Sequence, residues 1–290
     1  MQILFDNLLP ITIAIIMFGI GLNLSFDDFK RVFTFPKAII YGLVGQLVVL
    51  PLIGFLLAYL VPLEPAYKIG IVLIAICPGG TSSNIVTYML KGRVALSVSI
   101  TAFNSFLIVL TIPILLRLAF YLFEPSGTFA ELTLYQTFFE VIYTVLIPVV
   151  GGILIGHFFP AFAKNIQPLL RYILPGLLFA VFLLAILLEN ANSTKSLQEY
   201  WDIFVPAFLL NFSVILIGFY SSRLINLPHE DQYTIAVEMG LQNSALAIFL
   251  ANNVLHMEGV SLVAVVYGSF TFFTTLFFGY VLKNYVPKAK

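Results

Sequence analysis

The chain has 290 residues and no net charge; 60% of its residues are hydrophobic and only 10% are charged. A soluble domain carries about 25% charged residues, so this composition predicts an all-α, polytopic membrane protein embedded in a lipid bilayer. No basic run points to nucleic acid as a partner. The single cysteine, Cys77, excludes an internal disulfide and a multi-cysteine metal site.

Nine apolar runs are long enough to span a bilayer as helices, and charged or Pro/Gly-rich turns separate them. In chain order they lie near 8–24, 38–61, 67–90, 94–123, 134–158, 168–188, 203–224, 230–254 and 259–283. The loops between them are short, so we expect one transmembrane unit over residues 1–290. Asp6 stands where a signal peptide would carry Lys or Arg, so we expect the first run to be a retained helix.

Lysine and arginine are distributed unevenly between the two sets of loops, and this bias sets the orientation of a membrane protein. The side that holds the loops after odd-numbered helices and the C-terminal segment carries eleven, namely Lys30, Arg31, Lys37, Lys91, Arg93, Lys164, Arg171, Arg223, Lys283, Lys288 and Lys290. The other side carries three, Lys68, Arg117 and Lys195. We therefore expect a multi-pass protein of the cell (inner) membrane, with the N-terminus outside and the C-terminus in the cytoplasm.

The third expected helix is interrupted by CPGG at residues 77–80 and continues through TSSN at residues 81–84. Proline removes a backbone donor and glycine tolerates unwound backbone, so polar backbone groups are released at membrane depth. Such groups are tolerated only where they are buried in protein, line a cavity or bind a ligand. A packing kink would explain the Pro-Gly-Gly run alone, whereas the polar residues after it favour a binding site.

The eighth expected helix carries Glu238 inside an apolar run. A charged side chain at bilayer depth costs about 2.5–3.5 kcal/mol on insertion scales, and no Lys or Arg lies between Arg223 and Lys283 to offset it. Glu238 is therefore either a protonated carboxyl that is hydrogen-bonded inside the bundle or a ligand of a bound cation. Neutral oxygen donors nearby in sequence, or at the matching place in the other interrupted helix, favour the cation: Ser83, Asn84, Ser97, Thr101, Gln46 and Gln242.

One carboxylate among neutral oxygens suits Na⁺ better than Ca²⁺. Zinc would prefer His or Cys, and the three histidines (His157, His229 and His256) are expected in loops. Ser97 and Thr101 share one helix face, although both hydroxyls could bond back to their own helix carbonyls. Gln46 could equally serve only as a contact between helices.

The third and eighth expected helices share an order of features: a glycine-containing break, a polar residue followed by Asn, a half helix and a following span. The loop count places the start of the third helix outside and the start of the eighth inside, so the two units are inverted. Paired interruptions in two inverted halves point to a binding site at the membrane midplane. We therefore predict an inverted-repeat transporter whose two discontinuous helices cross near the membrane centre.

The chain resembles the bile acid:sodium symporter family, bacterial branch, over nearly its whole length. The segments that carry the resemblance are MFGIGL at 17–22, DDF at 27–29, Gln46, CPGGTSSN at 77–84 and EMGLQNS at 238–244. The resemblance implies a nine-helix form with two domains. A panel would contain the helices near 8–24, 134–158 and 168–188, and a core would contain the other six.

By position, the resemblance implies two sodium sites that share one carboxylate. The first would use Ser83, Asn84, Ser97, Thr101 and Glu238, and the second Gln46, Glu238 and Gln242 with the backbone carbonyls of Met239 and Leu241. The substrate would lie between panel and core, with Thr81, Ser82 and Asn243 as its polar contacts. Some bacterial relatives have a His-Asn pair where this chain has Phe272-Phe273, so we do not assign the substrate of those relatives to this chain.

These observations predict a sodium-coupled symporter, not an enzyme, that imports an organic anion by alternating access, and the resemblance implies two Na⁺ per cycle. A bile acid or a small carboxylate would fit as the anion. A proton-coupled transporter with Glu238 as the proton carrier is the alternative in the same class. An intramembrane hydrolase would need a Ser or Cys within reach of a base at depth, and a structural or receptor-like protein would not need paired inverted breaks.

Overall fold

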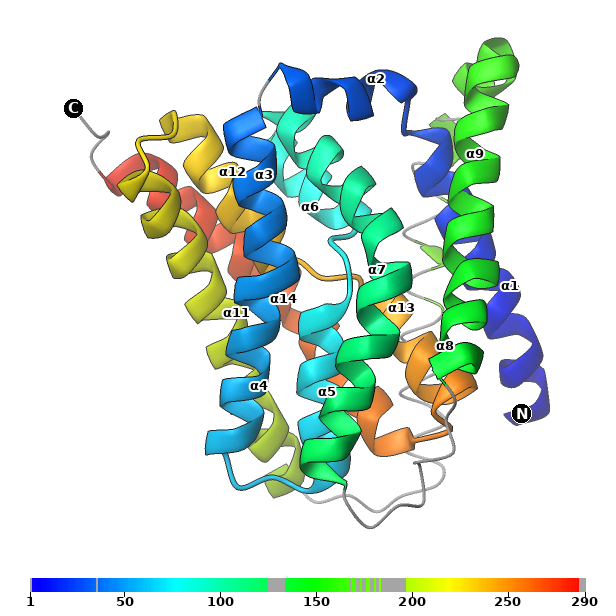
Figure 1. Ribbon diagram of the computed structural model, residues 1–290, viewed down its shortest axis with the longest axis vertical. Helices are drawn as coiled ribbons and strands as arrows, with labels where there is room; N and C mark the ends of the chain where they lie inside the picture. The colour runs from blue at the N-terminus through cyan, green and yellow to red at the C-terminus, as the bar shows by residue number, and fades with distance from the viewer. Residues whose placement is uncertain are drawn as a thin grey trace.

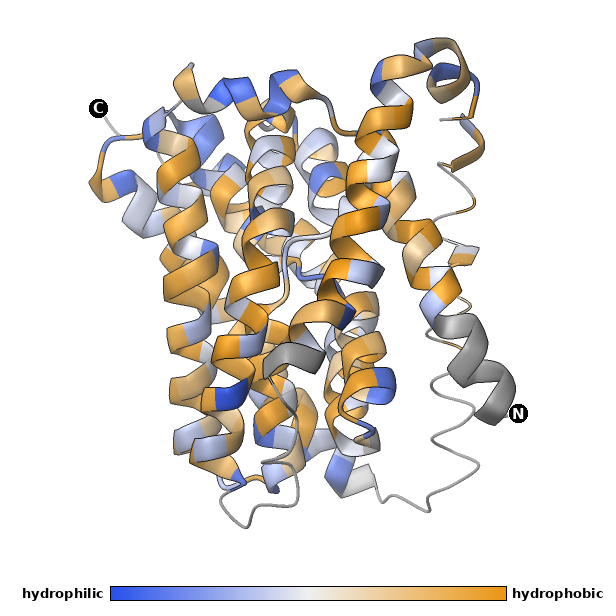
Figure 2. Cartoon of the chain, turned by 45° about the vertical axis from the view of Figure 1, so that its right-hand side comes forward, coloured by the Kyte–Doolittle hydropathy of each residue, from blue (hydrophilic) through white to orange (hydrophobic). Residues whose placement is uncertain are grey.

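The computed structural model describes residues 2–34, 36–124, 134–166, 168–170 and 197–286, with single positions between 173 and 183. These residues form a bundle of helices that run roughly along one axis, and they contain no β-strand (Figure 1). Hydrophobic residues dominate the lengths of the helices, and hydrophilic residues gather at the ends of the bundle and in the loops at its middle (Figure 2). Within the described ranges, five helices are long and apolar enough to cross a membrane: Pro36–Leu60, Val94–Phe123, Thr137–Phe158, Glu199–Leu224 and Gly259–Tyr285.

The described helices other than α2 overlap eight of the nine predicted spans. The bounds of the described helices are α1 Gln2–Leu22, α2 Phe26–Lys30, α3 Pro36–Val44, α4 Leu50–Leu60, α5 Pro65–Ile76, α6 Thr81–Met89, α7 Val94–Phe123, α8 Leu134–Val141, α9 Ile147–Phe158, α11 Leu197–Leu224, α12 His229–Gly240, α13 Ser244–Phe249 and α14 Glu258–Tyr285. The predicted spans near 67–90 and 230–254 are each divided into two helices, so neither is among the five long apolar helices. The expected span near 168–188 lies outside the described residues, apart from scattered positions.

Several details differ from the expectations. Helix α11 begins at Leu197 rather than near 203. The short helix α2 has no predicted counterpart; it begins after Ser25, whose backbone N and hydroxyl donate to Asp28 Oδ2 at 2.7 and 2.8 Å. His157 lies in the last turn of α9 and His229 is the first residue of α12, so these two histidines are in helix ends and not in loops.

Three π-helical turns widen the helices at Gly45–Val49, Ile142–Leu146 and Leu250–Val254. The first two come just before Pro51 and Pro148. A proline inside a helix lacks a donor and its ring collides with the carbonyl four residues earlier, and a wider turn relieves that conflict. The turn that accommodates Pro51 also carries Gln46, whose buried side chain points into the bundle.

Helices α1 and α9 pack with their backbones almost in contact, and glycine permits this approach. A Cβ atom on Gly152 would lie 2.3 Å from the backbone oxygen of Phe18, and one on Gly21 would lie 2.2 Å from the backbone oxygen of Val149. Small residues at such contacts are typical of helix pairs in membranes. The pair forms the right-hand side of the bundle in Figure 1.

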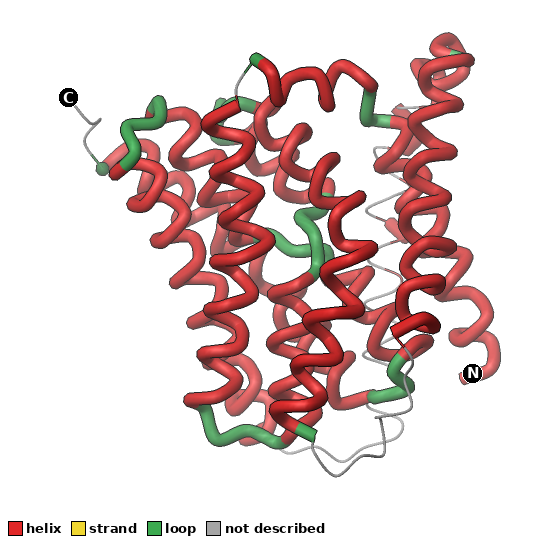
Figure 3. The backbone as a smooth tube through the Cα atoms, viewed as in Figure 1, coloured by secondary structure: helices red, strands yellow, loops and turns green. Residues whose placement is uncertain are grey.

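The two breaks in the helices lie beside each other at the centre of the bundle, where Figure 3 draws them as loops. One break joins α5 to α6 through residues 77–80, and the other joins α12 to α13 through residues 241–243. Gly79 and Gln242 form an isolated antiparallel bridge, and the Asn243 backbone N donates to Pro78 O at 2.8 Å. Backbone groups freed by one break are therefore satisfied by the other.

The two divided helices run in opposite directions. The turn between α6 and α7 contacts the first half of α12, because Tyr233 Oη donates to Lys91 O at 2.9 Å and the Arg93 backbone N donates to Thr234 Oγ1 at 3.0 Å. Arg93 Nε also lies 3.0 Å from Asp231 Oδ1 in an ion pair. Helix α6 thus ends at the end of the bundle where α12 begins.

Candidate ion-binding site

Glu238 lies in the last turn of α12 and is fully buried. The side chains that contact its carboxylate come from three other parts of the chain: Gln46 from the π-helical turn, Ser83 from α6, and Ser97 and Thr101 from α7. All four contacts are made by neutral groups, and Glu238 forms no ion pair within the described residues. The negative charge is therefore surrounded by short polar side chains and lacks a cationic one.

Two serine hydroxyls each face more acceptors than they have protons. Ser83 Oγ lies 2.7 Å from Gly80 O and 2.8 Å from Glu238 Oε1. Ser97 Oγ lies 2.7 Å from Asn84 Oδ1 and also bonds to Glu238 Oε1. A hydroxyl donates one hydrogen bond and its remaining capacity is to accept, so these converging oxygens carry more acceptors than donors. A cation that binds oxygen satisfies such an arrangement.

The four hydroxyls of Ser97, Ser99, Thr101 and Ser105, in the first part of α7, divide into two groups. Ser99 and Ser105 bond back to their own helix, at Ala95 O and Thr101 O, both at 2.8 Å. Ser97 and Thr101 instead reach Glu238; Thr101 Oγ1 lies 3.3 Å from Oε1 and 3.2 Å from Oε2. The alternative of back-bonding therefore does not describe Ser97 and Thr101 in this structure.

Gln46 approaches Glu238 from the other side through its amide nitrogen. Its Nε2 lies 3.3 Å from Glu238 Oε2 and 3.0 Å from the backbone oxygen of Glu238. Its Oε1 accepts a hydrogen bond of 2.6 Å from Asn104 Nδ2. Gln46 therefore contacts the carboxylate of Glu238 directly and does more than join two helices.

The remaining residues of the predicted second site surround the end of α12. Gln242 Nε2 donates to Met239 O at 2.8 Å and to Glu238 O at 3.3 Å, while Gln242 Oε1 is buried and has no hydrogen-bond partner in the described structure. The glycine-containing break expected in this helix begins after Gly240 and not at it, because α12 ends at Gly240 and the break comprises Leu241, Gln242 and Asn243. The carbonyl of Met239 thus belongs to a helix end and that of Leu241 to the break.

At Gly79 the first break approaches the carboxylate so closely that an added methyl group would displace the ends of the Glu238 and Gln46 side chains. A Cβ atom on Gly79 would lie 2.7 Å from Glu238 Oε2 and 3.0 Å from Gln46 Nε2. A Cβ on the neighbouring Gly80 would lie no closer than 3.8 Å to any atom, in ordinary contact with Asn243. The two glycines of the break therefore have different roles.

A second polar cluster, which the sequence did not reveal, holds the last carbonyl of α12. Asn211 Nδ2 of α11 donates to Gly240 O at 2.7 Å, and Tyr267 Oη of α14 donates to the same oxygen at 2.9 Å. Thr274 Oγ1 donates to Asn211 Oδ1 at 2.8 Å and so orients that amide. Helical spacing within α11 or α14 gives no sign of these contacts, because each partner lies on a different helix.

The residues predicted to contact substrate lie at the starts of the two second halves. Thr81 and Ser82 are in the first turn of α6 and are half-buried, and Asn243 is buried at the N-cap of α13. Asn243 Oδ1 accepts from the Leu246 backbone N at 3.1 Å. The side-chain oxygen of Asn243 thus stabilises the start of the half helix.

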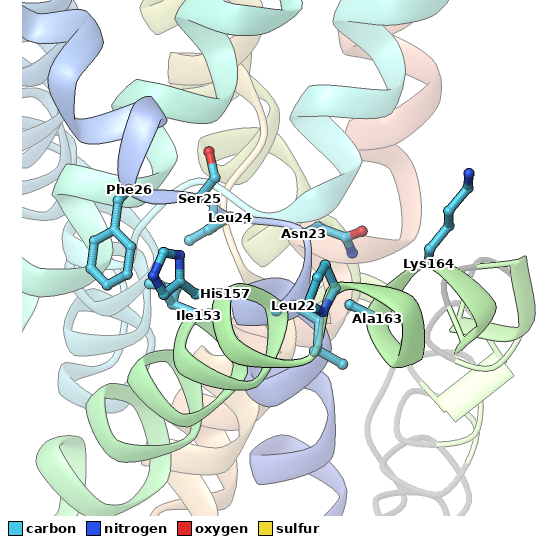
Figure 4. Close-up of a pocket in the computed structure, with 11 residues that line it drawn as sticks. Leu22, Asn23, Leu24, Ser25, Phe26, Ile153, His157, Ala163 and Lys164 are labelled. Carbon is cyan, nitrogen blue, oxygen red and sulfur yellow. The ribbon is translucent and has the colours of Figure 1, made fainter.

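A cavity of about 400 Å³ lies elsewhere, between the end of α1, the start of α2 and the end of α9. Figure 4 shows His157 beside Phe26 at this cavity, with Asn23, Ser25 and Lys164 around it. Its lining shares no residue with the predicted sodium or substrate sites. It is therefore distinct from the site at the helix crossing.

Paired broken helices around a buried carboxylate define the chain as a helical membrane protein with a polar site at its centre. Residues 10–196 match the sequence model of the Sodium Bile acid symporter family, and the chain belongs to this family.

Individual relatives agree with this assignment. The chain is 32% identical to the uncharacterized sodium-dependent transporter YocS of Bacillus subtilis, over 85% of this chain and 74% of that protein. It is 34% identical to the probable sodium/metabolite cotransporter BASS1, chloroplastic, of Oryza sativa, over 83% of this chain and 57% of that protein. It is 27% identical to the ileal sodium/bile acid cotransporter of Homo sapiens, over 85% of this chain and 69% of that protein.

Proposed function

We propose that the chain is a symporter that couples entry of Na⁺ to import of an organic anion by alternating access. The observation that carries the proposal is the shortage of protons around Glu238, where Ser83 Oγ faces both Gly80 O and Glu238 Oε1 at hydrogen-bond distance. Hard cations select oxygen ligands, and a monovalent ion needs few full charges around it. Membership of the Sodium Bile acid symporter family supports Na⁺ as that ion.

We assign two Na⁺ to the cycle, both sharing Glu238. The first would be held by Ser83, Asn84, Ser97, Thr101 and Glu238, and the second by Gln46, Gln242 and Glu238 with the carbonyls of Met239 and Leu241. Contacts around Glu238 already join Gln46 and the three hydroxyls to one carboxylate. In the proton-coupled alternative a proton on Glu238 would supply one of the missing donors, whereas a cation would use several of these oxygens as ligands.

The substrate in this proposal is an organic anion, a bile acid or a small carboxylate, bound near Thr81, Ser82 and Asn243. The half helices α6 and α13 begin there, and helix N-termini favour negative charge. We further propose the nine-helix arrangement with a panel and a core, and an N-terminus outside with the C-terminus in the cytoplasm. The opposed directions of α5–α6 and α12–α13 support the inverted repeat.

The test is uptake into proteoliposomes of a panel of labelled anions: taurocholate, pantoate and pyruvate. An inward Na⁺ gradient should drive uptake of at least one of them, and replacing Na⁺ with choline should abolish it. Uptake that persists in choline and follows an imposed pH gradient would replace sodium coupling with proton coupling. Binding of ²²Na⁺ to the purified protein tests the ion site without knowledge of the substrate, and a protein that binds no ²²Na⁺ contradicts the proposal.

A further inference from the structure

Asn104 extends the contacts of Glu238 by one more residue. It lies on α7 three positions after Thr101, and its side chain is 1% exposed. Asn104 Nδ2 donates to Gln46 Oε1 at 2.6 Å, and Gln46 Nε2 lies 3.3 Å from Glu238 Oε2. Two amides and a carboxylate thus form a chain across three helical segments.

The direction of this chain follows from the chemistry of its end. An ionised carboxylate only accepts hydrogen bonds, so Gln46 must turn its nitrogen toward Glu238 and its oxygen toward Asn104. Asn104 must then present its own nitrogen. Its Oδ1 is left buried and has no hydrogen-bond partner among the residues that the structure describes, which is unfavourable for a polar group away from water.

A cation between Gln46 and Glu238 reverses the requirement, because both residues must then offer oxygen. Gln46 Oε1 turns toward the ion, and Nε2 turns toward Asn104. Only an acceptor at position 104 can satisfy that nitrogen, and Asn104 provides one if its amide also turns. The Asn104 oxygen then accepts from Gln46 Nε2, and Asn104 Nδ2 gives up its bond to Gln46 Oε1 in exchange.

We infer that Asn104 is a positioning residue that sets the orientation of the Gln46 amide and so controls whether Gln46 can ligate the second sodium ion. The inference rests on the proposed function, because it requires sodium at the second site. It adds a residue that itself does not touch the ion. Asn104 acts through one hydrogen bond, first as donor and then as acceptor.

The experiment measures ²²Na⁺ bound per molecule of the purified full chain, with choline balancing the ionic strength. In Asn104→Leu the new side chain has a similar shape but no acceptor. Gln46 Nε2 would then lack a hydrogen-bond partner when Gln46 Oε1 turns to the ion. We expect the second ion to bind about tenfold or more weakly, with the first ion retained. Asn104→Asp keeps an acceptor, so we expect it to bind the second ion at least as tightly as the unmodified chain.

A double-mutant cycle separates positioning from a general packing role. Gln46→Leu should weaken binding of the second ion as Asn104→Leu does. The double variant should bind that ion no more weakly than either single variant. Ser105→Ala is the matched control, since Ser105 is buried on the same helix and bonds only to Thr101 O among its described contacts. It should bind sodium as the unmodified chain does.

Two results would overturn the inference while leaving the proposed function intact: two ions bound normally by Asn104→Leu, or additive losses in the cycle. Weaker binding of the second ion by Asn104→Asp would also overturn the inference. If Asn104→Leu does not elute as a folded protein, Asn104→Asp provides the test. An unmodified chain that binds no ²²Na⁺ would overturn the proposed function and the inference together.

Discussion

Ser83 and Glu238 lie 155 positions apart in the sequence, yet the Ser83 hydroxyl donates to Glu238 Oε1 at 2.8 Å. The contact joins α6 to α12, the two helices that meet at the breaks. Ser97 adds α7 to the same carboxylate oxygen. The oxygen cluster therefore exists only when these three helices are packed together, so ion binding should stabilise their packing.

Glu238→Gln should remove sodium binding at both proposed sites. The substitution keeps the shape of the side chain but removes its charge and places an N–H donor where the ion needs an oxygen. Losing one partner of a buried charged contact costs about 2–5 kcal/mol, so we expect affinity to fall by about a hundredfold or more. Binding of ²²Na⁺ is the measurement, with Glu64→Gln in the loop before α5 as the control. Sodium-driven uptake that survives Glu238→Gln would contradict the shared carboxylate.

Gly79→Ala and Gly80→Ala should differ sharply although the residues are adjacent. The added methyl at position 79 would lie 2.7 Å from Glu238 Oε2, whereas at position 80 its nearest neighbour would be 3.8 Å away. We expect Gly79→Ala to abolish ²²Na⁺ binding and to lower the unfolding temperature, and Gly80→Ala to retain both. Normal ²²Na⁺ binding by Gly79→Ala would contradict the expectation and show that the Glu238 and Gln46 side chains shift to accommodate a methyl group.

Arg93→Ala should destabilise the protein, because Asp231 would keep a buried charge without its partner. The Asp231 side chain is 2% exposed and that of Arg93 is 26% exposed. Breaking a buried ion pair by removing one member costs about 3 kcal/mol or more, so the unfolding temperature in detergent should fall clearly. The control is Asp27→Asn, which breaks a pair with Lys30 in which both side chains are 74% exposed; exposed pairs contribute little. An unchanged unfolding temperature for Arg93→Ala would contradict the expectation.

Tyr267→Phe should have a small effect alone and a large one together with Asn211→Leu. Both side chains donate to Gly240 O, so either one leaves the buried carbonyl with a donor. We expect the single change to cost about 1 kcal/mol of unfolding free energy, and the pair to cost more than the sum of the singles because the carbonyl loses both donors. Thermal unfolding of the four proteins in the cycle measures this. Strict additivity would mean that the two donors act independently of the shared oxygen.

Features that depend on nearby residues were predictable from the sequence. The run CPGG indicated the first break because a proline followed directly by two glycines disfavours a continuous helix, and α7 occupies the predicted range 94–123. A carboxylate in an apolar run without a local cation indicated a polar centre at Glu238. The second break was placed slightly too early, since Gly240 is the last helical residue and not part of the unwound segment.

Features that depend on contacts between distant segments could not be read from the chain. Asn104 lies three residues after Thr101 on one face of α7, but the sequence analysis did not single it out, because its relation to Gln46 requires the fold. The Asn211 and Tyr267 donors to Gly240 O, and the ion pair of Arg93 with Asp231, each join helices whose separation in sequence carries no periodic pattern. The π-helical turn at Gly45–Val49 is a local response to Pro51 and sets the direction of Gln46.

Main-chain bonds between the two interruptions have a mechanical consequence. Pro78 O accepts from the Asn243 backbone N, and Gly79 pairs with Gln242, so pulling the four half helices apart would expose unpaired amides in a medium without water. A movement that opens the protein first to one face of the membrane and then to the other should therefore move the two hydrogen-bonded breaks together as one rigid unit. The hinges of such a movement must therefore lie elsewhere, where helices slide on apolar surfaces.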